Sequence, residues 1–340
     1  MSSKLRSIFS GRLHLIEGEY FWASRGRFIY SSCDNGRNWK RIAVLRIPIL
    51  SRLYSASKLA RRLSRMYVNQ IVRIDKNSLA IVGFGYVFFY SLSCNKVMSK
   101  YPIRGKRPLV VCAHEGRLIY GEYRGNFERG PISLISVDKN AGNKEIYTFS
   151  NIRHIHGVSC DPIDDSLWVT TGDNDDESAI WHFKTLGMRP RMVCGGSQKY
   201  RAVQLLFDSN YVYYGTDTPL EQNYICRIDR GSYRVEQLHL VGSSIFYGCT
   251  VNGRHVFGSV CEPSDVNEVS HITMYCSNGK DSYEWSAFLR LSKDFWSMRW
   301  FQYGQVFFPF GCNNSNQLYF TPMGVDGDQN TYKIQLPVKE

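Results

Sequence analysis

Four acidic residues recur at equivalent places in a repeating sequence pattern. Each follows an apolar run rich in β-branched and aromatic side chains, and the spacings are 51, 44 and 45 residues: Glu122, Asp173, Asp217 and Glu262. Two carboxylates that meet can protonate a glycosidic oxygen and activate water, and several oxygen ligands can hold a divalent ion. The chemistry of the chain therefore depends on whether its fold brings these residues together.

The period of the pattern predicts a β-propeller. Repeats of roughly 40–50 residues, each with four short strands, are typical of propeller blades. In the clearest repeat we expect strands at 157–160, 167–171, 179–183 and 191–194. Seven such segments begin near Arg12, Asn69, Leu109, His156, Arg201, Phe246 and Trp296. We expect an all-β chain with one domain over residues 1–340 and seven blades. Six blades would result if the first and last segments combined into one blade closed by both chain ends.

Propeller topology decides which side chains share a face. The loops that lead from an outermost strand to the next innermost strand open on the same face as the loops between second and third strands. The four acidic residues lie in loops of the second kind. Loops of the first kind hold His154, His156, Tyr200, Arg201, Tyr247 and Lys293. We therefore expect all ten side chains at one mouth of the central channel.

Two kinds of catalysis fit these residue types. Paired carboxylates beside histidine suit a glycoside hydrolase, whereas histidine and tyrosine suit a polysaccharide lyase if arginine or a metal neutralises a uronate. His156 is the better candidate base, because Gly157 lets substrate approach the backbone, and the other candidate catalytic residues are His154, Asp217 and Glu262. We expect substrate contacts from Glu122, Asp173, Tyr200, Arg201, Tyr247 and Lys293. Asp173, Asp217 and Glu262 are candidate ligands for calcium or manganese.

One interval between the first two blades interrupts the pattern. Residues 49–67 predict a single inserted amphipathic helix, with apolar side chains such as Leu53 and Leu63 on one face. The other face is basic and carries Lys58, Arg61, Arg62 and Arg65. Either the apolar face docks on the propeller and the basic face is solvated, or residues 49–67 contact a membrane surface or a polyanion.

Composition limits the classes of partner and compartment. The net charge of +12, from 42 basic and 30 acidic residues, favours polyanions, but no nucleic-acid-binding motif is present and we expect no nucleic-acid partner. The ten cysteines include no Cys-x-x-Cys pair and suit small core residues of a reduced protein. Without a signal peptide or a long apolar stretch, the expected location is cytoplasmic, with membrane association through residues 49–67 as an alternative.

The segment from Ser32 to Trp39 fits the pattern Ser-x-Asp-x-Gly-x-x-Trp. It resembles the Asp box of the BNR-repeat, sialidase-like propellers. In that family the box joins the third and fourth strands of a blade on the face away from the active site. The resemblance therefore implies a propeller fold, with Asp34 stabilising a turn rather than taking part in catalysis.

A second resemblance covers about residues 110–310. The segments 153–162, 170–177, 214–219 and 262–264 are similar to uncharacterised BNR-like propellers found with genes for bacterial surface-polysaccharide synthesis. This resemblance implies a glycan ligand or substrate. The expected function is a carbohydrate-active enzyme, either hydrolase or lyase, and the alternative is a non-catalytic scaffold that binds glycan or protein in polysaccharide assembly.

Overall fold

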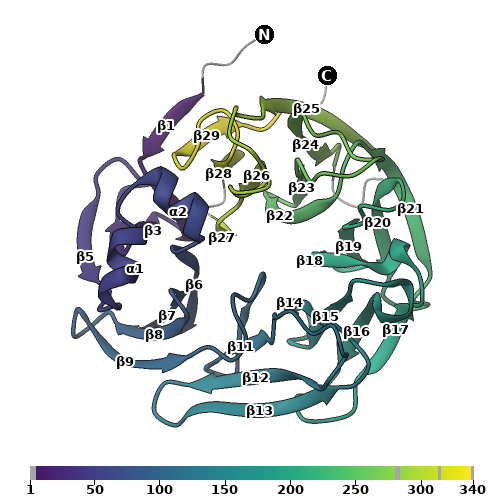
Figure 1. Cartoon of the computed structure of the whole chain (residues 1–340), viewed down its shortest axis with the longest axis horizontal. Helices are drawn as coiled ribbons and strands as arrows, with labels where there is room; N and C mark the ends of the chain where they lie inside the picture. Colours follow the sequence, from purple (N-terminus) through teal and green to yellow (C-terminus); the bar gives the residue numbers. More distant parts are fainter. Residues whose placement is uncertain (1–4, 280–283, 313–314, 338–340) are drawn as a thin grey trace.

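The computed structural model describes residues 5–279, 284–312 and 315–337. Seven β-sheets, antiparallel apart from one added parallel strand, stand around a central channel as the blades of a propeller (Figure 1). The predicted all-β class and the seven blades are confirmed, and the six-blade alternative is wrong.

Blades 1 to 6 each contain four consecutive strands, which follow one another from the channel outwards. Blade 1 has β2 (Arg12–Glu17), β3 (Tyr20–Arg25), β4 (Phe28–Ser32) and β5 (Lys40–Val44), and blade 2 has β6 (Val68–Asp75), β7 (Ser78–Gly83), β8 (Tyr86–Ser91) and β9 (Lys96–Pro102). Blade 3 has β10 (Cys112–His114), β11 (Arg117–Gly121), β12 (Ile132–Asp138) and β13 (Gly142–Phe149), and blade 4 has β14 (His154–Cys160), β15 (Leu167–Gly172), β16 (Ala179–Phe183) and β17 (Arg191–Gly195). Blade 5 has β18 (Ala202–Phe207), β19 (Tyr211–Thr216), β20 (Asn223–Asp229) and β21 (Val235–Val241), and blade 6 has β22 (Ile245–Val251), β23 (Arg254–Ser259), β24 (His271–Ser277) and β25 (Trp285–Ser292).

Blade 7 closes the ring with strands from both ends of the chain. It contains β26 (Gln305–Phe307), β28 (Gln317–Met323), β29 (Thr331–Gln335) and, outermost, the N-terminal β1 (Arg6–Phe9). A further strand, β27 (Phe310–Cys312), runs parallel to β2 on the channel side of blade 1. Thr331 fastens the two blades together, because its hydroxyl accepts from Leu13 N and donates to Gly11 O.

The apolar core lies between neighbouring blades. One cluster joins Leu15 and Trp22 of blade 1 to Ile71 and Phe88 of blade 2, and similar clusters fill the other gaps. Because each blade packs only on its neighbours, a chain of 340 residues needs no single large core.

Glycines before the acidic residues permit this packing. A Cβ atom on Gly121 would lie 2.2 Å from Ile155, and one on Gly215 would lie 2.3 Å from Ile245, each on the innermost strand of the next blade. No side chain fits so close an approach. The recurring pattern of apolar residues, glycine and acid therefore partly reflects contact between blades.

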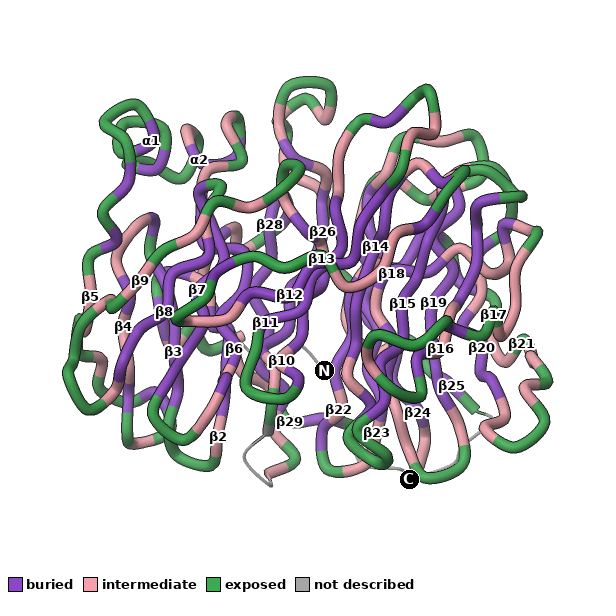
Figure 2. Tube along the Cα trace, turned by 90° about the horizontal axis from the view of Figure 1, so that it is seen from below, coloured by how far each residue is buried: buried purple, intermediate pink, exposed green. Residues whose placement is uncertain are grey.

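The inserted segment differs from its prediction. It forms two short helices, α1 (Ile49–Tyr54) and α2 (Lys58–Ser64), on one face of the ring (Figure 2). The basic side is the docked side: Arg61 and Arg62 are 8% and 2% exposed. Arg61 donates to Gln329 Oε1 and Arg62 pairs with Asp294, which anchors α2 to the last two blades.

The apolar side of the two helices faces solvent instead. Ile49, Leu53 and Leu63 are 70%, 65% and 55% exposed. The prediction of an apolar face docked on the propeller is therefore wrong. No helix among the described residues is long and apolar enough to cross a membrane. The cysteines whose side chains are described are all free thiols.

Candidate functional site

The innermost strands begin at the face that carries α1 and α2, and their first residues surround the channel there. We call this end the mouth. His156 lies near the start of β14, and Arg201 immediately precedes β18. Other blades contribute Arg12 at the start of β2 and Tyr247 in β22, so residues from several blades meet at one level of the channel.

His156 is at the centre of the predicted cluster. Its Nε2 lies 3.1 Å from Asp173 Oδ1, and its Nδ1 lies 3.7 Å from Asp217 Oδ2. Its side chain is 2% exposed, and burial lowers the pKa of His156 to about 4 although the hydrogen bond to Asp173 opposes the shift. The imidazole is therefore uncharged at neutral pH and lies between two carboxyl groups.

Asp173 is the most heavily bonded carboxylate at the mouth. His154 Nε2 lies 3.3 Å from its Oδ1, and Arg153 and Arg201 approach its oxygens at 2.9 and 3.3 Å. Burial opposes its ionisation, but the adjacent imidazoles of His154 and His156, the second of them hydrogen-bonded, outweigh burial and hold the pKa of Asp173 well below its ordinary value. Asp173 is therefore a fixed negative charge.

Asp217 has the opposite character. Burial raises the pKa of Asp217 well above its ordinary value, although Arg201 Nε lies 3.5 Å away and opposes the shift. Burial also raises the pKa of Glu262, whose Oε2 lies 3.2 Å from the Ser244 hydroxyl. One mouth thus contains a carboxylate that readily ionises and two carboxyl groups that tend to keep a proton, the separation of pKa values that acid–base catalysis uses.

Two arginines next to this cluster have no described carboxylate partner. Arg107 donates to the Tyr67 hydroxyl, and the Arg12 guanidinium stacks on Phe307 at 3.6 Å. Burial lowers the pKa of Arg12 to about 10, so the group stays charged at neutral pH. Among the described residues, neither arginine forms an ion pair with a carboxylate. The space that these residues enclose with Tyr247 is about 10 Å³, room for roughly one water molecule.

Three predicted site residues do not join the cluster. Glu122 accepts from Ser133 N of its own blade and pairs with Arg104. Lys293 donates to Asp294 and to Trp296 O, close to the anchor of α2. The ring of Tyr200 lies 5.2 Å from Lys199 Nζ. Their loops lie on the predicted face, but we find no described contact between these side chains and the histidines.

Sequence reasoning missed five residues of the mouth. Arg12, Tyr67, Arg107 and Arg153 lie at or just before innermost strands, the position that singled out His156, so the same topological rule would have found them. The fifth is Tyr123, whose ring lies 4.2 Å from that of His154. Burial raises the pKa of Tyr123 to about 12, and the charge of Asp173 adds to the shift.

The tightest group of metal-ligand types at the mouth differs from the predicted set of Asp173, Asp217 and Glu262. It consists of His154, His156 and Asp173, whose donor atoms lie within 4.8 Å of one another. Arg153 and Arg201 already neutralise Asp173. Because a cation would meet two guanidinium groups there, the mouth does not suit calcium or manganese.

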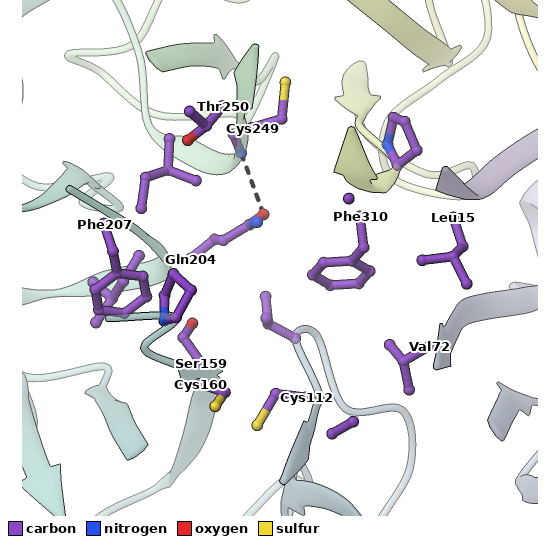
Figure 3. Close-up of a pocket in the computed structure, with 18 of the residues that line it drawn as sticks. Leu15, Val72, Cys112, Ser159, Cys160, Gln204, Phe207, Cys249, Thr250 and Phe310 are labelled. Atoms are coloured by element: carbon purple, nitrogen blue, oxygen red, sulfur yellow. Dashed lines mark hydrogen bonds between the residues drawn. The ribbon is translucent and has the colours of Figure 1, made fainter. Parts of the chain in front are cut away.

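A large cavity lies at the other end of the channel, away from His156, and we call this end the floor (Figure 3). Its volume is about 700 Å³, and the innermost strands of most blades line it with mainly apolar side chains. Representative lining residues are Leu15, Val72, Cys112, Cys160, Phe207 and Phe310. The sequence did not indicate this cavity, because each lining residue by itself is an ordinary core residue.

Comparison with known proteins supports the fold alone. No family model matches the sequence, and no curated protein matches it. A chain from the crystal structure of the Mitotic Checkpoint Complex is similar with a TM-score of 0.61 and 11% identity, over 99% of this chain and 96% of that chain. The dihydro-heme d1 dehydrogenase NirN in complex with DHE is similar with a TM-score of 0.54 and 13% identity, over 91% of this chain and 60% of that chain. At such identities these similarities show that the chain is a β-propeller and assign no activity.

Proposed function

We propose that the mouth binds the acidic sugar of a glycan and acts on an adjacent glycosidic bond. The observation that carries this proposal is the pair Arg12 and Arg107, two partly buried guanidinium groups without a described carboxylate partner. A buried charge without a counter-ion is costly, so an external anion would supply what the protein lacks. A uronate offers a carboxylate for the arginines and hydroxyls for Tyr67 and Tyr247.

Groups suited to proton transfer stand beside the arginines. Asp217, whose pKa burial raises, keeps a proton that it can donate to a glycosidic oxygen. Glu262 is more accessible than Asp217 and, once it has lost its proton, can activate a water molecule. His156 lies between Asp217 and the fixed charge of Asp173; its Nδ1 is 3.1 Å from Ala202 O and 3.7 Å from Asp217 Oδ2, so a proton passes between His156 and Asp217 only after a small movement. This set contains the two carboxyl groups that a hydrolase uses, while Arg12 and Arg107 would neutralise a uronate in a hydrolase or in a lyase, so product analysis has to separate the two.

The turn at Ser32–Trp39 supports kinship with Asp-box propellers of carbohydrate metabolism. Asp34 Oδ1 accepts from Arg37 N and Asn38 N, and Trp39 packs 4.5 Å from Phe9. The turn lies between β4 and β5, on the face away from the mouth, where the resemblance requires it. This kinship would place the protein in the synthesis or processing of bacterial surface polysaccharide.

The narrowness of the mouth favours a second candidate, a scaffold that binds glycan without cleaving it. The free space between Arg12 and Tyr247 is about 10 Å³, far smaller than a sugar ring. A sugar therefore has to displace side chains before it reaches His156. Binding of a chain end at the more accessible rim, near Arg153 and Glu262, would need less rearrangement.

Calorimetric titration with acidic and neutral oligosaccharides tests the proposal. Oligogalacturonate and oligoglucuronate should bind, while neutral oligosaccharides of equal length should not. Arg107→Gln should weaken acidic binding by about tenfold or more, because a charged hydrogen bond to the carboxylate is lost. Arg290→Gln, on the exposed outermost strand of blade 6, should leave binding unchanged.

Product analysis separates the activities. New reducing ends without an unsaturated uronate indicate a hydrolase, and absorbance of the unsaturated uronate indicates a lyase. Binding without cleavage supports the scaffold. Equal affinity for acidic and neutral sugars, or an Arg107→Gln variant that folds and binds normally, would contradict the proposed site.

A further inference from the structure

A second group of metal-ligand types lies at the floor. β10 and β14 are the innermost strands of blades 3 and 4, and they pack against each other. His114 is the last residue of β10, Cys160 is the last residue of β14, and Asp165 lies in the turn that follows. Two neighbouring blades thus bring a histidine, a thiol and a carboxylate to one place.

The spacing of the donor atoms matches a zinc coordination sphere. Cys160 Sγ lies 3.2 Å from Asp165 Oδ1 and 3.9 Å from His114 Nδ1, and the nitrogen lies 3.4 Å from the carboxylate oxygen. A tetrahedral zinc ion, with bonds of about 2.3 Å to sulfur and about 2.0–2.1 Å to nitrogen and oxygen, separates its donors by about 3.4–3.6 Å. Small movements would bring all three onto one ion.

Charge around this group favours a cation. Arg230 pairs with Asp161 and lies 3.8 Å from Asp164, but no described lysine or arginine pairs with Asp165. Glu115 Oε1 lies 3.8 Å from Nε2 of His114. A carboxylate hydrogen-bonded to the far nitrogen of a ligating histidine is the usual outer partner at zinc sites, and Glu115 would have to move closer to His114 to serve as one.

We propose that His114, Cys160 and Asp165 bind one zinc ion at the floor. The mixed set of nitrogen, sulfur and oxygen suits zinc better than calcium or magnesium, which prefer oxygen ligands. Three protein ligands leave a fourth position for water. Cys160 also lines the cavity of about 700 Å³, so a small molecule in that cavity could reach the ion.

Cys112 is a further donor type close to this group. It precedes His114 by two residues on β10, and Figure 3 shows its sulfur on the same side of the cavity as that of Cys160. It is the residue to test as a fourth protein ligand.

Metal titration of the reduced, chelator-treated chain tests the proposal. Zinc should bind with a stoichiometry of one and raise the melting temperature, since an ion that binds only the folded state stabilises it. Cobalt in its place should give thiolate-to-metal charge-transfer absorption, a signature of a cysteine ligand.

Variants locate the site. Asp165→Asn should keep the fold, because the side chain is exposed and the backbone φ of 58° suits asparagine, yet it should weaken zinc binding by at least about tenfold. Cys160→Ser should abolish the charge-transfer band. Cys249→Ser, which changes a cysteine elsewhere in the same cavity wall, should alter neither. Cys112→Ser should weaken binding only if Cys112 is a ligand. Wild-type protein that binds no zinc, or Asp165→Asn that binds it as well as wild type, would overturn the proposal.

Discussion

The mouth and the floor of the channel contain similar donor atoms in opposite electrostatic settings. At the mouth, His154 and His156 meet Asp173, whose charge Arg153 and Arg201 already neutralise. At the floor, His114 and Cys160 meet Asp165, with no described basic partner. The comparison teaches that a histidine–carboxylate cluster does not define a metal site by itself. The neighbouring cations decide whether it attracts a metal ion or an anion.

The two ends also differ in free space. The mouth is filled with polar side chains and leaves about 10 Å³ between Arg12 and Tyr247, whereas the floor encloses about 700 Å³ with mainly apolar walls. A small, charged space suits one acidic group, and a large apolar space suits an apolar ligand. The channel thus offers two sites of different chemistry.

Replacement of the His156 imidazole should have the largest effect on turnover, and it tests whether the mouth is catalytic. His156→Ala should reduce turnover of a cleaved acidic glycan by about two to four orders of magnitude, the usual size of a general acid–base contribution. Steady-state kinetics on the folded variant measures this loss of turnover. Asp34→Ala, in the turn on the opposite face, should lower the melting temperature and leave turnover nearly unchanged. A His156→Ala variant that loses only affinity would favour the scaffold.

The contrast between two mouth carboxyl groups should appear in stability as a function of pH. The raised pKa of Asp217 means that the folded protein loses stability as pH rises from about 4 through the folded pKa. Asp217→Asn removes that loss, so its melting temperature should exceed that of wild type by about 1–3 °C at pH 8 and match it near pH 4.

Asp173 should change the stability of the fold with pH in the opposite direction. Its lowered pKa stabilises the fold above about pH 4, and this stabilisation is lost as pH falls. Asp173→Asn should therefore lower the melting temperature by a similar amount at pH 8 and less at acid pH. Calorimetry at both pH values checks the pair of variants. Parallel pH profiles would show that the two groups are not electrostatically different.

The smallest effect concerns the exposed apolar side of α1 and α2 beside the mouth. If this surface contacts anionic membranes, Leu53→Glu should reduce retention on anionic vesicles, and salt should reduce what remains because exposed charges are screened beyond about 8 Å. Ile163→Glu, a similarly exposed apolar position at the floor, is the matched control. Equal retention of the two variants on the vesicles would show that the apolar side of α1 and α2 does not contact membranes.

Much of the fold could be predicted because propeller repeats carry a local signal. The pattern of apolar strand, glycine and acid indicated the blades, since Gly121 and Gly215 are required where the next blade approaches. Propeller topology then correctly brought His156 together with Asp173 and Asp217. Topology places a loop, however, and does not fix the direction of a side chain. Glu122 turns to Ser133 N and Lys293 to Asp294, partners that no repeat pattern shows.

The inserted helices and the floor show two further features that the sequence could not predict. Amphipathic periodicity separates two faces but cannot tell which one docks, and Arg61 and Arg62 reach Gln329 and Asp294, more than 200 positions away in sequence. At the floor, His114, Cys160 and Asp165 come from two blades. In the sequence each of these residues is compatible with an ordinary core or turn position. Only the distances between their side chains reveal a common site.

Diffraction from a crystal grown with zinc and an acidic oligosaccharide tests the central claim, that the two ends attract opposite charges. We expect an anomalous zinc peak within bonding distance of Cys160 Sγ, His114 Nδ1 and Asp165, and a sugar carboxylate beside Arg12 and Arg107. A zinc peak between His154, His156 and Asp173, with none at the floor, would contradict it.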